Sequence, residues 1–209
     1  MSLDVSRQNT MRLCTYIVKV DTGLAPNPFW GWCTLALCTP NHMGVKLNPK
    51  DWIVGFLSKI RANKLLFAMQ ITEVLHFDDY FRDKQFSKKI PILKGSWKER
   101  CGDNIYYLDS QGNWQQAPTV YHRGMIEKDT KHPYAFVSNH FYYFGQKAPK
   151  VPTKYQSLIP AGQGVKCNHD NKKVTNFIVW LNSNFSLGIH GLPIDNKERK
   201  NQRLTSCST

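Results

Sequence analysis

The chain has 209 residues, of which 41% are hydrophobic and 21% charged, so it can form one large domain and is too apolar for wholesale disorder. Its 28 lysines and arginines against 15 aspartates and glutamates give a net charge of +13, which favours nucleic acid or another polyanionic partner, although a basic charge that only aids solubility is an equal alternative. No apolar run approaches the roughly 20 residues that cross a bilayer, so no membrane partner is expected.

Residues 1–10 are polar and lack periodicity, so we interpret them as a flexible leader before a single domain over residues 11–194. The first strand is expected over residues 14–20, which are rich in β-branched and aromatic side chains. A second apolar segment follows at residues 34–39. Between these segments, residues 25–32 contain two prolines, and a loop is expected there.

This loop holds two candidates for contact with a base, Asn27 and Phe29. A loop fixed by proline that also carries two tryptophans can present rings on which a base stacks. The alternative, which we favour slightly, is that the loop folds these rings into the core.

Residues 51–81 form the stretch around which we expect the domain to be organised. Two apolar runs, residues 52–56 and 65–75, are joined by a short basic loop and predict paired strands in the middle of a sheet. The runs are nearly continuous rather than alternating, which indicates that both faces are covered. After them, Asp78 or Asp79 is expected to cap a short helical turn.

Residues 82–100 contain seven basic side chains and two acidic ones. Lysines and arginines that neutralise phosphates, with an aromatic ring such as Trp97 nearby, are typical of nucleic-acid contact. The candidates for phosphate contact are Lys88, Lys89 and Arg100. A charge run is more often a solvated face, and that alternative stays open.

Two further candidates lie in the middle of the chain. Asp103 and Asn104 sit in a Gly-Asp-Asn turn that can expose both side chains, or in which they bond their own backbone. Residues 109–113 predict a hairpin turn. His122 follows the returning arm and is a candidate general base or phosphate ligand, although a lone histidine is more often structural.

Residues 132–138 predict another strand, and four aromatic residues at 141–144 follow it. In a strand, alternate rings face opposite sides, so one pair can line a pocket while the other packs in the core. Ser138 and His140 lie at the edge of this run. A base needs stacking faces and hydrogen bonds to its edge, so this is the best local candidate for base recognition, with core packing as the alternative.

The last part of the chain is less informative. Residues 147–154 indicate a connection, and residues 175–181 predict either a strand or a short helix. Residues 195–209 form a polar tail that is expected to fray. The elements together predict an α+β, β-rich fold, a single compact domain around a mixed or barrel-like sheet.

The six cysteines form no C-x-x-C pair and no cysteine-histidine spacing of a zinc site, so no metal is expected. Several lie in apolar runs, where a thiol packs as a small hydrophobe. Without a secretory signal or an evident disulfide framework, we interpret all six as reduced and the protein as cytoplasmic. The sequence indicates no particular cofactor.

An ordered series of short motifs points to a family. Residues 21–29, 34–40, 51–55, 102–106 and 141–145 together resemble the prokaryotic and phage family called nucleotide modification associated domain 2, over about residues 16–160. Two positions depart from the pattern, because Lys50 stands where a glycine is expected and Asn41-His42 where a basic residue is expected. The resemblance implies a link to systems that modify nucleic-acid bases, and a fold similar to PUA or EVE domains, which cradle modified bases, is an analogy for it.

These observations leave three hypotheses. The first is a protein that recognises a modified base in a DNA-modification or phage-defence system, with DNA carrying that base as its partner. The second is an enzyme that acts on a base or nucleotide, either a glycosidic hydrolase or a base-modifying transferase, with Asp21, Asp103 and His122 as catalytic groups and Asp51 as a further acid-base candidate. The third is an interaction subunit of such a system.

The first two hypotheses share one structural expectation. Asp21, Asp103, Asn104 and the rings of residues 141–144 should converge on one cationic cavity shaped for a base. The residues expected to contact the base or nucleotide are Asn27, Phe29, Trp52, Asn104, Ser138, His140, Phe141 and Tyr143.

Overall fold

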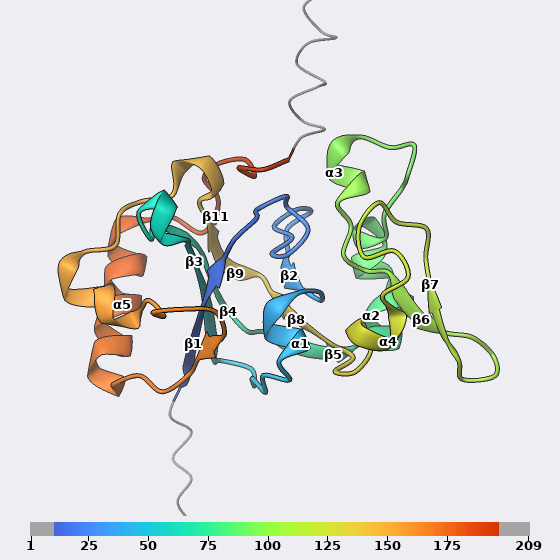
Figure 1. Ribbon diagram of the computed structural model, residues 1–209, viewed down its shortest axis with the longest axis horizontal. Helices are drawn as coiled ribbons and strands as arrows, with labels where there is room; N and C mark the ends of the chain where they lie inside the picture. The colour runs from blue at the N-terminus through green and yellow to red at the C-terminus, as the bar shows by residue number, and fades with distance from the viewer. Residues whose placement is uncertain (1–10, 197–209) are drawn as a thin grey trace, which may run out of the picture.

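The hairpin predicted within residues 51–81 forms the centre of the largest sheet in the computed structural model, which describes residues 11–196. Its arms are antiparallel, and the first arm also pairs with the N-terminal strand in parallel. The sheet therefore mixes both pairing types (Figure 1). In sheet order its six strands are β10 (Val165–Lys166), β1 (Leu13–Val18), β3 (Trp52–Leu57), β4 (Leu65–Gln70), β9 (His140–Tyr143) and β11 (Gly188–Ile189).

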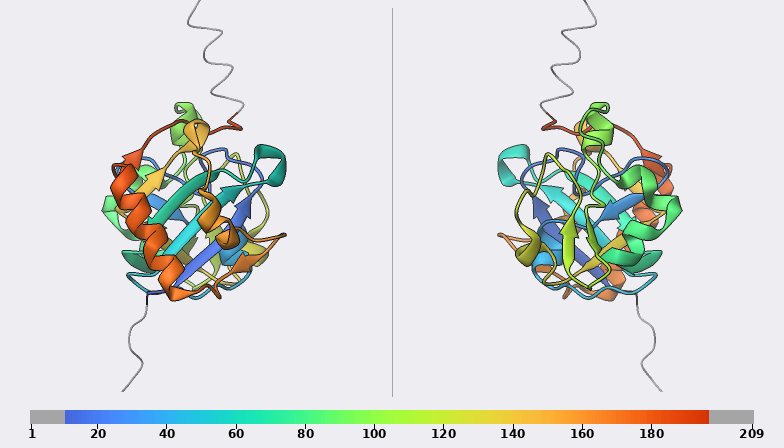
Figure 2. Two further views of the ribbon diagram at one scale, coloured as in Figure 1. Left: turned by 90° about the vertical axis from the view of Figure 1, so that its left-hand side faces the viewer. Right: turned by 90° about the vertical axis from the view of Figure 1, so that its right-hand side faces the viewer.

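Both faces of the central strands are covered, as their continuous apolar pattern predicts. Every residue of β3 is buried. Helix α5 (Asn171–Asn184) packs on one face through a stripe of apolar residues (Figure 2, left), and these are Val174, Phe177, Ile178 and Leu181. The segment at residues 175–181 is thus helical, and Asp170 caps it by accepting a hydrogen bond from the Lys173 backbone N–H at 2.8 Å.

A second, antiparallel sheet lies beside the first. It has the order β2 (Cys33–Leu35), β8 (Tyr134–Ser138) and β5 (Glu73–His76). The chain passes from one sheet to the other with almost no connection at two points, where β4 leads into β5 and β8 leads into β9. The predicted turn at residues 109–113 joins a separate hairpin, β6 (Tyr106–Leu108) and β7 (Trp114–Gln116).

Short helices fill the connections. They are α1 (Thr39–His42), α2 (Phe77–Arg82), α3 (Trp97–Arg100), α4 (Ile126–Asp129) and the 3-10 helices η1 (Lys59–Arg61), η2 (Lys84–Lys89), η3 (Gly145–Lys147) and η4 (Thr153–Leu158). The capping role expected of Asp78 or Asp79 is wrong, because α2 begins after His76 and both aspartates lie in its first turn. Asp78 instead accepts hydrogen bonds from the Leu108 backbone N–H and from Arg82.

The expected fold class is confirmed in its mixed-sheet form, because helix and strand are combined around one large sheet in a single compact domain. The barrel-like alternative is wrong for the described residues, since the six-stranded sheet is open. Its edge strands, β10 and β11, have two residues each and stand at opposite ends of the order. The analogy to PUA or EVE domains stays a prediction.

A disulfide joins Cys14 of β1 to Cys167, which follows β10. The expectation that all six cysteines are reduced is therefore wrong for this pair. The physical reason is the register of the sheet, because Thr15 lies opposite Lys166 and brings the two flanking Cα atoms to 4.1 Å. Within residues 11–196 the cysteines outside this disulfide are Cys33, Cys38 and Cys101, and Cys207 lies outside the described residues.

The predicted leader lies outside the described residues, as does the predicted tail from residue 197 onward. The first two residues of that tail are held in place rather than frayed. Asp195 forms an ion pair with Arg61 at 2.8 Å, and Asn196 is buried and donates a hydrogen bond to the Thr22 carbonyl. None of the helices described between residues 11 and 196 has the length and apolar character that a membrane span requires.

Candidate functional site

Cys38 stands at a sharp turn between the second sheet and helix α1. Its φ is +75°, a left-handed backbone conformation that residues other than glycine rarely adopt. Its side chain is half-buried and lines a cavity of about 570 Å³, together with residues of β1 and of the segment at 163–164. A thiol in this position is accessible to a small molecule, whereas the thiols of Cys33 and Cys101 are completely buried.

His122 and Asp129 complete a chain of contacts that begins at this thiol. The Nε2 atom of His122 lies 3.3 Å from the Sγ atom of Cys38, and its Nδ1 atom lies 2.7 Å from Oδ2 of Asp129. His122 lies in the loop after β7, and Asp129 is the last residue of α4, which packs beside α1 (Figure 1). A thiol, an imidazole and a carboxylate thus stand in the order found in cysteine nucleophile systems.

Tyr106 and Gln116 form hydrogen bonds that stabilise the positions of Asp129 and His122. The hydroxyl of Tyr106 donates a hydrogen bond to Oδ2 of Asp129 at 2.7 Å. The amide of Gln116 donates to the hydroxyl of Tyr106 at 3.0 Å and to the backbone carbonyl of His122 at 2.7 Å. Because Asp129 is buried and held by a second donor, it fixes the orientation of the imidazole ring.

The electrostatics of His122 follow from these contacts. Burial lowers its pKa, but the hydrogen bonds to the Asp129 carboxylate and to Cys38 outweigh burial and raise the pKa to about 9. The imidazole is therefore protonated at neutral pH. The imidazolium lies 3.3 Å from the Cys38 sulfur, within hydrogen-bond distance of it.

Tyr16 of β1 is one of the residues that line the same cavity. Its side chain is 3% exposed, and its hydroxyl has no hydrogen-bond partner among the described residues. Burial, and after it the nearby Cys38, raises the pKa of this hydroxyl well above its usual value, so the group is a neutral donor. A buried donor without a partner is costly, and a bound ligand would satisfy it.

The two aspartates expected to be catalytic lie elsewhere. Asp21 accepts hydrogen bonds from the hydroxyl of Tyr143 at 2.6 Å and from the Ile194 backbone N–H at 3.0 Å, which ties the C-terminal segment to β9. Asp103 is fully buried and accepts from Thr34 at 2.7 Å and from Tyr80 at 2.9 Å. Burial raises the pKa of both carboxyls.

Lys89 does not fit the expected role in phosphate binding, because it is buried inside the domain. Its Nζ atom donates three hydrogen bonds of 2.8 Å, to both oxygens of Asn27 and to the Trp32 carbonyl. Burial lowers its pKa to about 8, against the opposing effect of Asp103. The expected base ligand Asn27 is used in the same interior cluster, and Asn104 donates to the Tyr80 carbonyl.

The other expected ligands are spread over the fold. Trp52, His140 and Phe141 pack at one end of the main sheet, where the rings of Trp52 and His140 lie 5.5 Å apart. Ser138 bonds the backbone of His140 and shapes the turn from β8 to β9. Phe29 packs against Trp97, and both oxygens of Asp51 accept backbone N–H groups. Lys88 is exposed, while Arg100 donates to the Gly95 carbonyl.

The expectation that these groups converge on one cavity is therefore wrong. Asp103, Asn104 and the rings at 141–144 are buried, and none of them lines a cavity described here. Of the expected catalytic residues, His122 alone lies in the Cys38 site. Sequence reasoning missed Cys38, Asp129 and Tyr16, although a cysteine accompanied by a histidine and an aspartate elsewhere in the chain is a recognised signal for a nucleophile. Within residues 11–196, no group of three or more histidine, cysteine, aspartate or glutamate side chains is arranged to hold a metal ion.

Comparison with known proteins gives one match. The model of the family described as nucleotide modification associated domain 2 matches residues 10–200. No curated protein and no solved structure matches the chain. The matched range includes Tyr16, Cys38, His122 and Asp129.

Proposed function

The chain belongs to the nucleotide modification associated domain 2 family, and on that premise we propose that it is an enzyme acting on a nucleotide or its base, with Cys38 as covalent nucleophile. The family description links the domain to nucleotide modification systems and leaves its own activity open. Of the two enzyme reactions considered from the sequence, the base-modifying transferase fits this site better, with Cys38 as a nucleophile that the sequence analysis did not select.

The observation that carries the proposal is the contact of Cys38 with His122, and of His122 with Asp129, at 3.3 and 2.7 Å. A cysteine paired with a histidine is the arrangement that activates a thiol as a nucleophile. The histidine in turn needs an acceptor on its far nitrogen to hold its orientation and charge, and Asp129 is that acceptor. The left-handed backbone at both Cys38 and His122 supports the proposal, because such strain clusters at active sites.

The chemistry that this set of groups performs is acyl-type transfer. The Cys38 thiolate attacks an electrophilic carbon carried by the nucleotide, and an S–C bond forms as the bond to the leaving group breaks. His122 gives its proton to that leaving group. Water or another nucleophile then attacks the intermediate, gives its proton to His122 and releases the thiolate, so the enzyme returns to its first state. The Tyr16 hydroxyl supplies a hydrogen bond to the substrate in the same cavity.

Recognition of a modified base without chemistry is the second candidate. The observation that favours it is the buried hydroxyl of Tyr16, which has no hydrogen-bond partner among the described residues and belongs to a residue that lines the cavity, since a bound base would satisfy this donor. A glycosidic hydrolase fits less well, because it needs a pair of carboxyl groups at the sugar, and Asp21, Asp51 and Asp103 use their oxygens in hydrogen bonds within the fold.

The test is incubation of the protein with phage DNA that carries modified bases, with unmodified DNA and with the corresponding nucleotides, followed by mass spectrometry of the nucleosides and of the protein. We expect altered nucleosides in the modified samples and a mass adduct on the peptide of Cys38 at early times. Cys38→Ala should abolish both, while Cys33→Ala is the matched control, since Cys33 is a free but fully buried thiol. Unaltered nucleosides without any adduct would reject the enzyme, and selective retention of modified DNA by both variants would then favour the recognition module.

A further inference from the structure

We infer that this site takes a nucleic-acid strand rather than a free base, and that a groove from Cys38 to Lys59 and Lys150 binds the phosphates of that strand. The inference rests on the proposed function, since it assumes that the reacting base lies at Cys38. It narrows the substrate to a nucleic-acid strand, and it assigns a phosphate-binding surface other than the basic segment at residues 82–100.

Two cavities adjoin to make this groove. The first is the cavity of about 570 Å³ that Cys38 and Tyr16 line. The second has a volume of about 740 Å³ and shares two of its lining residues, Ile17 and Gln163, with the first. Each cavity alone has the size of a small-molecule site, and the pair exceeds what a single base requires.

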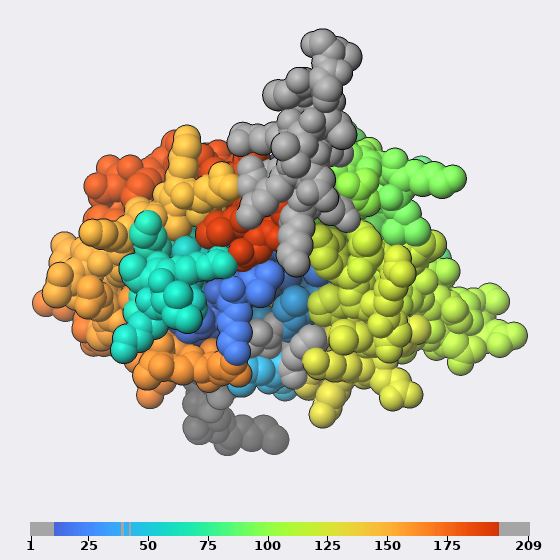
Figure 3. All heavy atoms as spheres, turned by 45° about the horizontal axis from the view of Figure 1, so that its top comes forward, coloured from blue at the N-terminus to red at the C-terminus, as the bar shows by residue number. Residues whose placement is uncertain are grey.

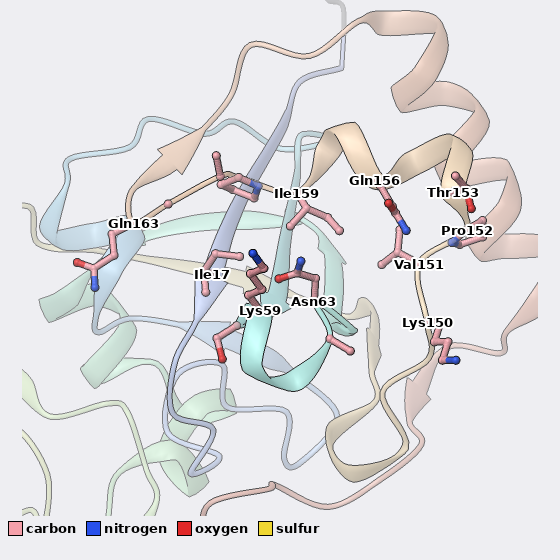
Figure 4. A pocket seen from close by; sticks show the side chains of 15 residues that line it. Ile17, Lys59, Asn63, Lys150, Val151, Pro152, Thr153, Gln156, Ile159 and Gln163 are labelled. Carbon is pink, nitrogen blue, oxygen red and sulfur yellow. The ribbon is translucent and has the colours of Figure 1, made fainter.

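The walls of the second cavity come from three separate segments. Lys59 and Asn63 stand on the β3–β4 connection and face Ile159 and Gln156 across the cavity, with Ile17 of β1 beside them (Figure 4). Lys150 lies on the segment before η4. On the molecular surface the β3–β4 connection (teal) lies beside β1 (blue) and the segment after η4 (orange), as Figure 3 shows.

The polar groups of the groove have one sign of charge. Lysines stand along its length, with Lys19 in the first cavity and Lys59 and Lys150 in the second, and the described residues that line the two cavities include no carboxylate. By contrast, another cavity lined by lysines, next to α5, also contains Asp170. A groove with cations and no anions attracts a polyanion and does not repel it at any point.

The neutral polar groups of the groove suit the same ligand. Asn63, Gln156 and Gln163 carry amides that can both donate to phosphate oxygens and bond base edges. A nucleotide with its base at Cys38 would extend its sugar and phosphates past Ile17 and Gln163 into the second cavity. An enzyme that reacts with a base must take that base out of the stack, so a single strand or an extruded nucleotide is the form that fits.

The binding test compares two double variants that remove the same charge. Lys59→Ala with Lys150→Ala removes the two lysines of the second cavity, and Lys84→Ala with Lys88→Ala is the matched control on the exposed basic segment. Affinity for a fluorescently labelled oligothymidylate is measured by anisotropy over a range of salt concentrations. We expect the groove variant to bind at least tenfold more weakly and to lower the slope of log affinity against log salt by about 1.4, because each phosphate contact on a single strand contributes roughly 0.7. The control should change neither value, and loss of binding in the control alone would overturn the inference.

Three more arms separate the inference from its alternatives and from the proposed function. Thymidine monophosphate should compete weakly against the strand, since it reaches only part of the groove, and polyglutamate should not compete. Equal competition by polyglutamate would reject a nucleic-acid ligand. If the groove variant binds more weakly and no Cys38 adduct forms, the inference about the groove is supported and the proposed function is rejected. If Cys38 adducts form and the groove variant binds normally, the proposed function is supported and the inference about the groove is rejected.

Discussion

The Sγ atom of Cys38 lies 3.3 Å from Nε2 of His122, although 84 positions separate the two residues in the chain. Both residues have a left-handed backbone, with φ values of +75° and +56°. Such conformations cost roughly 1–3 kcal/mol each and persist when the surroundings determine them. Here the Gln116 amide donates a hydrogen bond to the His122 carbonyl, and the Asp129 carboxylate is hydrogen-bonded to the His122 ring. These two hydrogen bonds fix the position of His122 next to Cys38.

The first prediction concerns the reactivity of this thiol. At neutral pH, iodoacetamide should alkylate Cys38 faster than Cys33 and Cys101, because Cys38 is accessible and stands beside an imidazolium. His122→Ala removes the cation and should slow alkylation of Cys38 at least tenfold. Peptide mass spectrometry over time measures all three cysteines in one sample. An unchanged rate in the variant would show that His122 does not activate the thiol.

The second prediction is a dependence of stability on pH. The pKa of His122 rises from 6.5 to about 9 on folding, so its contribution to stability is complete below pH 6.5 and is lost as pH rises toward 9. The stability difference between the wild type and His122→Ala should shrink by up to about 3 kcal/mol over this range, at 1.36 kcal/mol for each pKa unit. Urea unfolding at pH 6 and pH 10 measures it. A difference that stays constant between the two pH values would contradict the raised pKa.

The third prediction assigns the orienting role to Asp129. Asp129→Asn keeps the shape of the side chain and removes its charge, so the pKa of His122 should fall from about 9 toward 6.5. Titration of the imidazole signals by NMR gives this pKa directly. Tyr106→Phe removes a neutral hydroxyl that donates to this carboxylate and accepts from Gln116, but it leaves the charge of Asp129 in place. It is the control and should leave the His122 pKa high. The same shift in both variants would point to general loosening of the loop instead.

Local patterns predicted much of the scaffold. The continuous apolar runs of β3 and β4, and the turn residues of the β6–β7 hairpin, act on neighbours in the sequence, and the pairing within both hairpins was predicted. The run at residues 65–75 was predicted as one arm, whereas it divides into β4 and β5 of different sheets. Contacts between distant segments were not visible in this way. The sequence indicated His122, but the thiol that it contacts lies 84 positions away, and the disulfide between Cys14 and Cys167 spans 153 positions.

The burial of Lys89 could not be predicted from the sequence either. A run of basic residues predicts a solvated surface, because lysines are almost never fully buried unless they are paired. The acceptors that permit its burial come from Asn27 and Trp32, in a loop that precedes it by about 60 positions. Their carbonyls cannot be assigned to Lys89 without the fold.

The fourth prediction follows from this burial. Lys89→Met should lower the free energy of unfolding by roughly 3 kcal/mol or more, because it leaves the Asn27 and Trp32 acceptors and the buried Asp103 without their cation. Lys88→Met, at the adjacent exposed position, should change it by less than about 0.5 kcal/mol. Chemical denaturation of the two variants gives the comparison. Equal effects would mean that the interior cluster contributes nothing beyond surface charge.

The fifth prediction concerns the bond between Cys14 and Cys167. It closes a loop of 153 positions and fastens the edge strand β10, which has only two residues, to the main sheet. Replacing both cysteines by alanine should destabilise the protein by roughly 2–4 kcal/mol, since the unfolded chain then gains the freedom that the cross-link removes. A reductant should lower the melting temperature of the wild type and leave that of the double variant unchanged. Cys33→Ala is the control for the loss of a buried cysteine that forms no disulfide. Identical melting temperatures for the oxidised wild type and the double variant would show that the cross-link adds no stability.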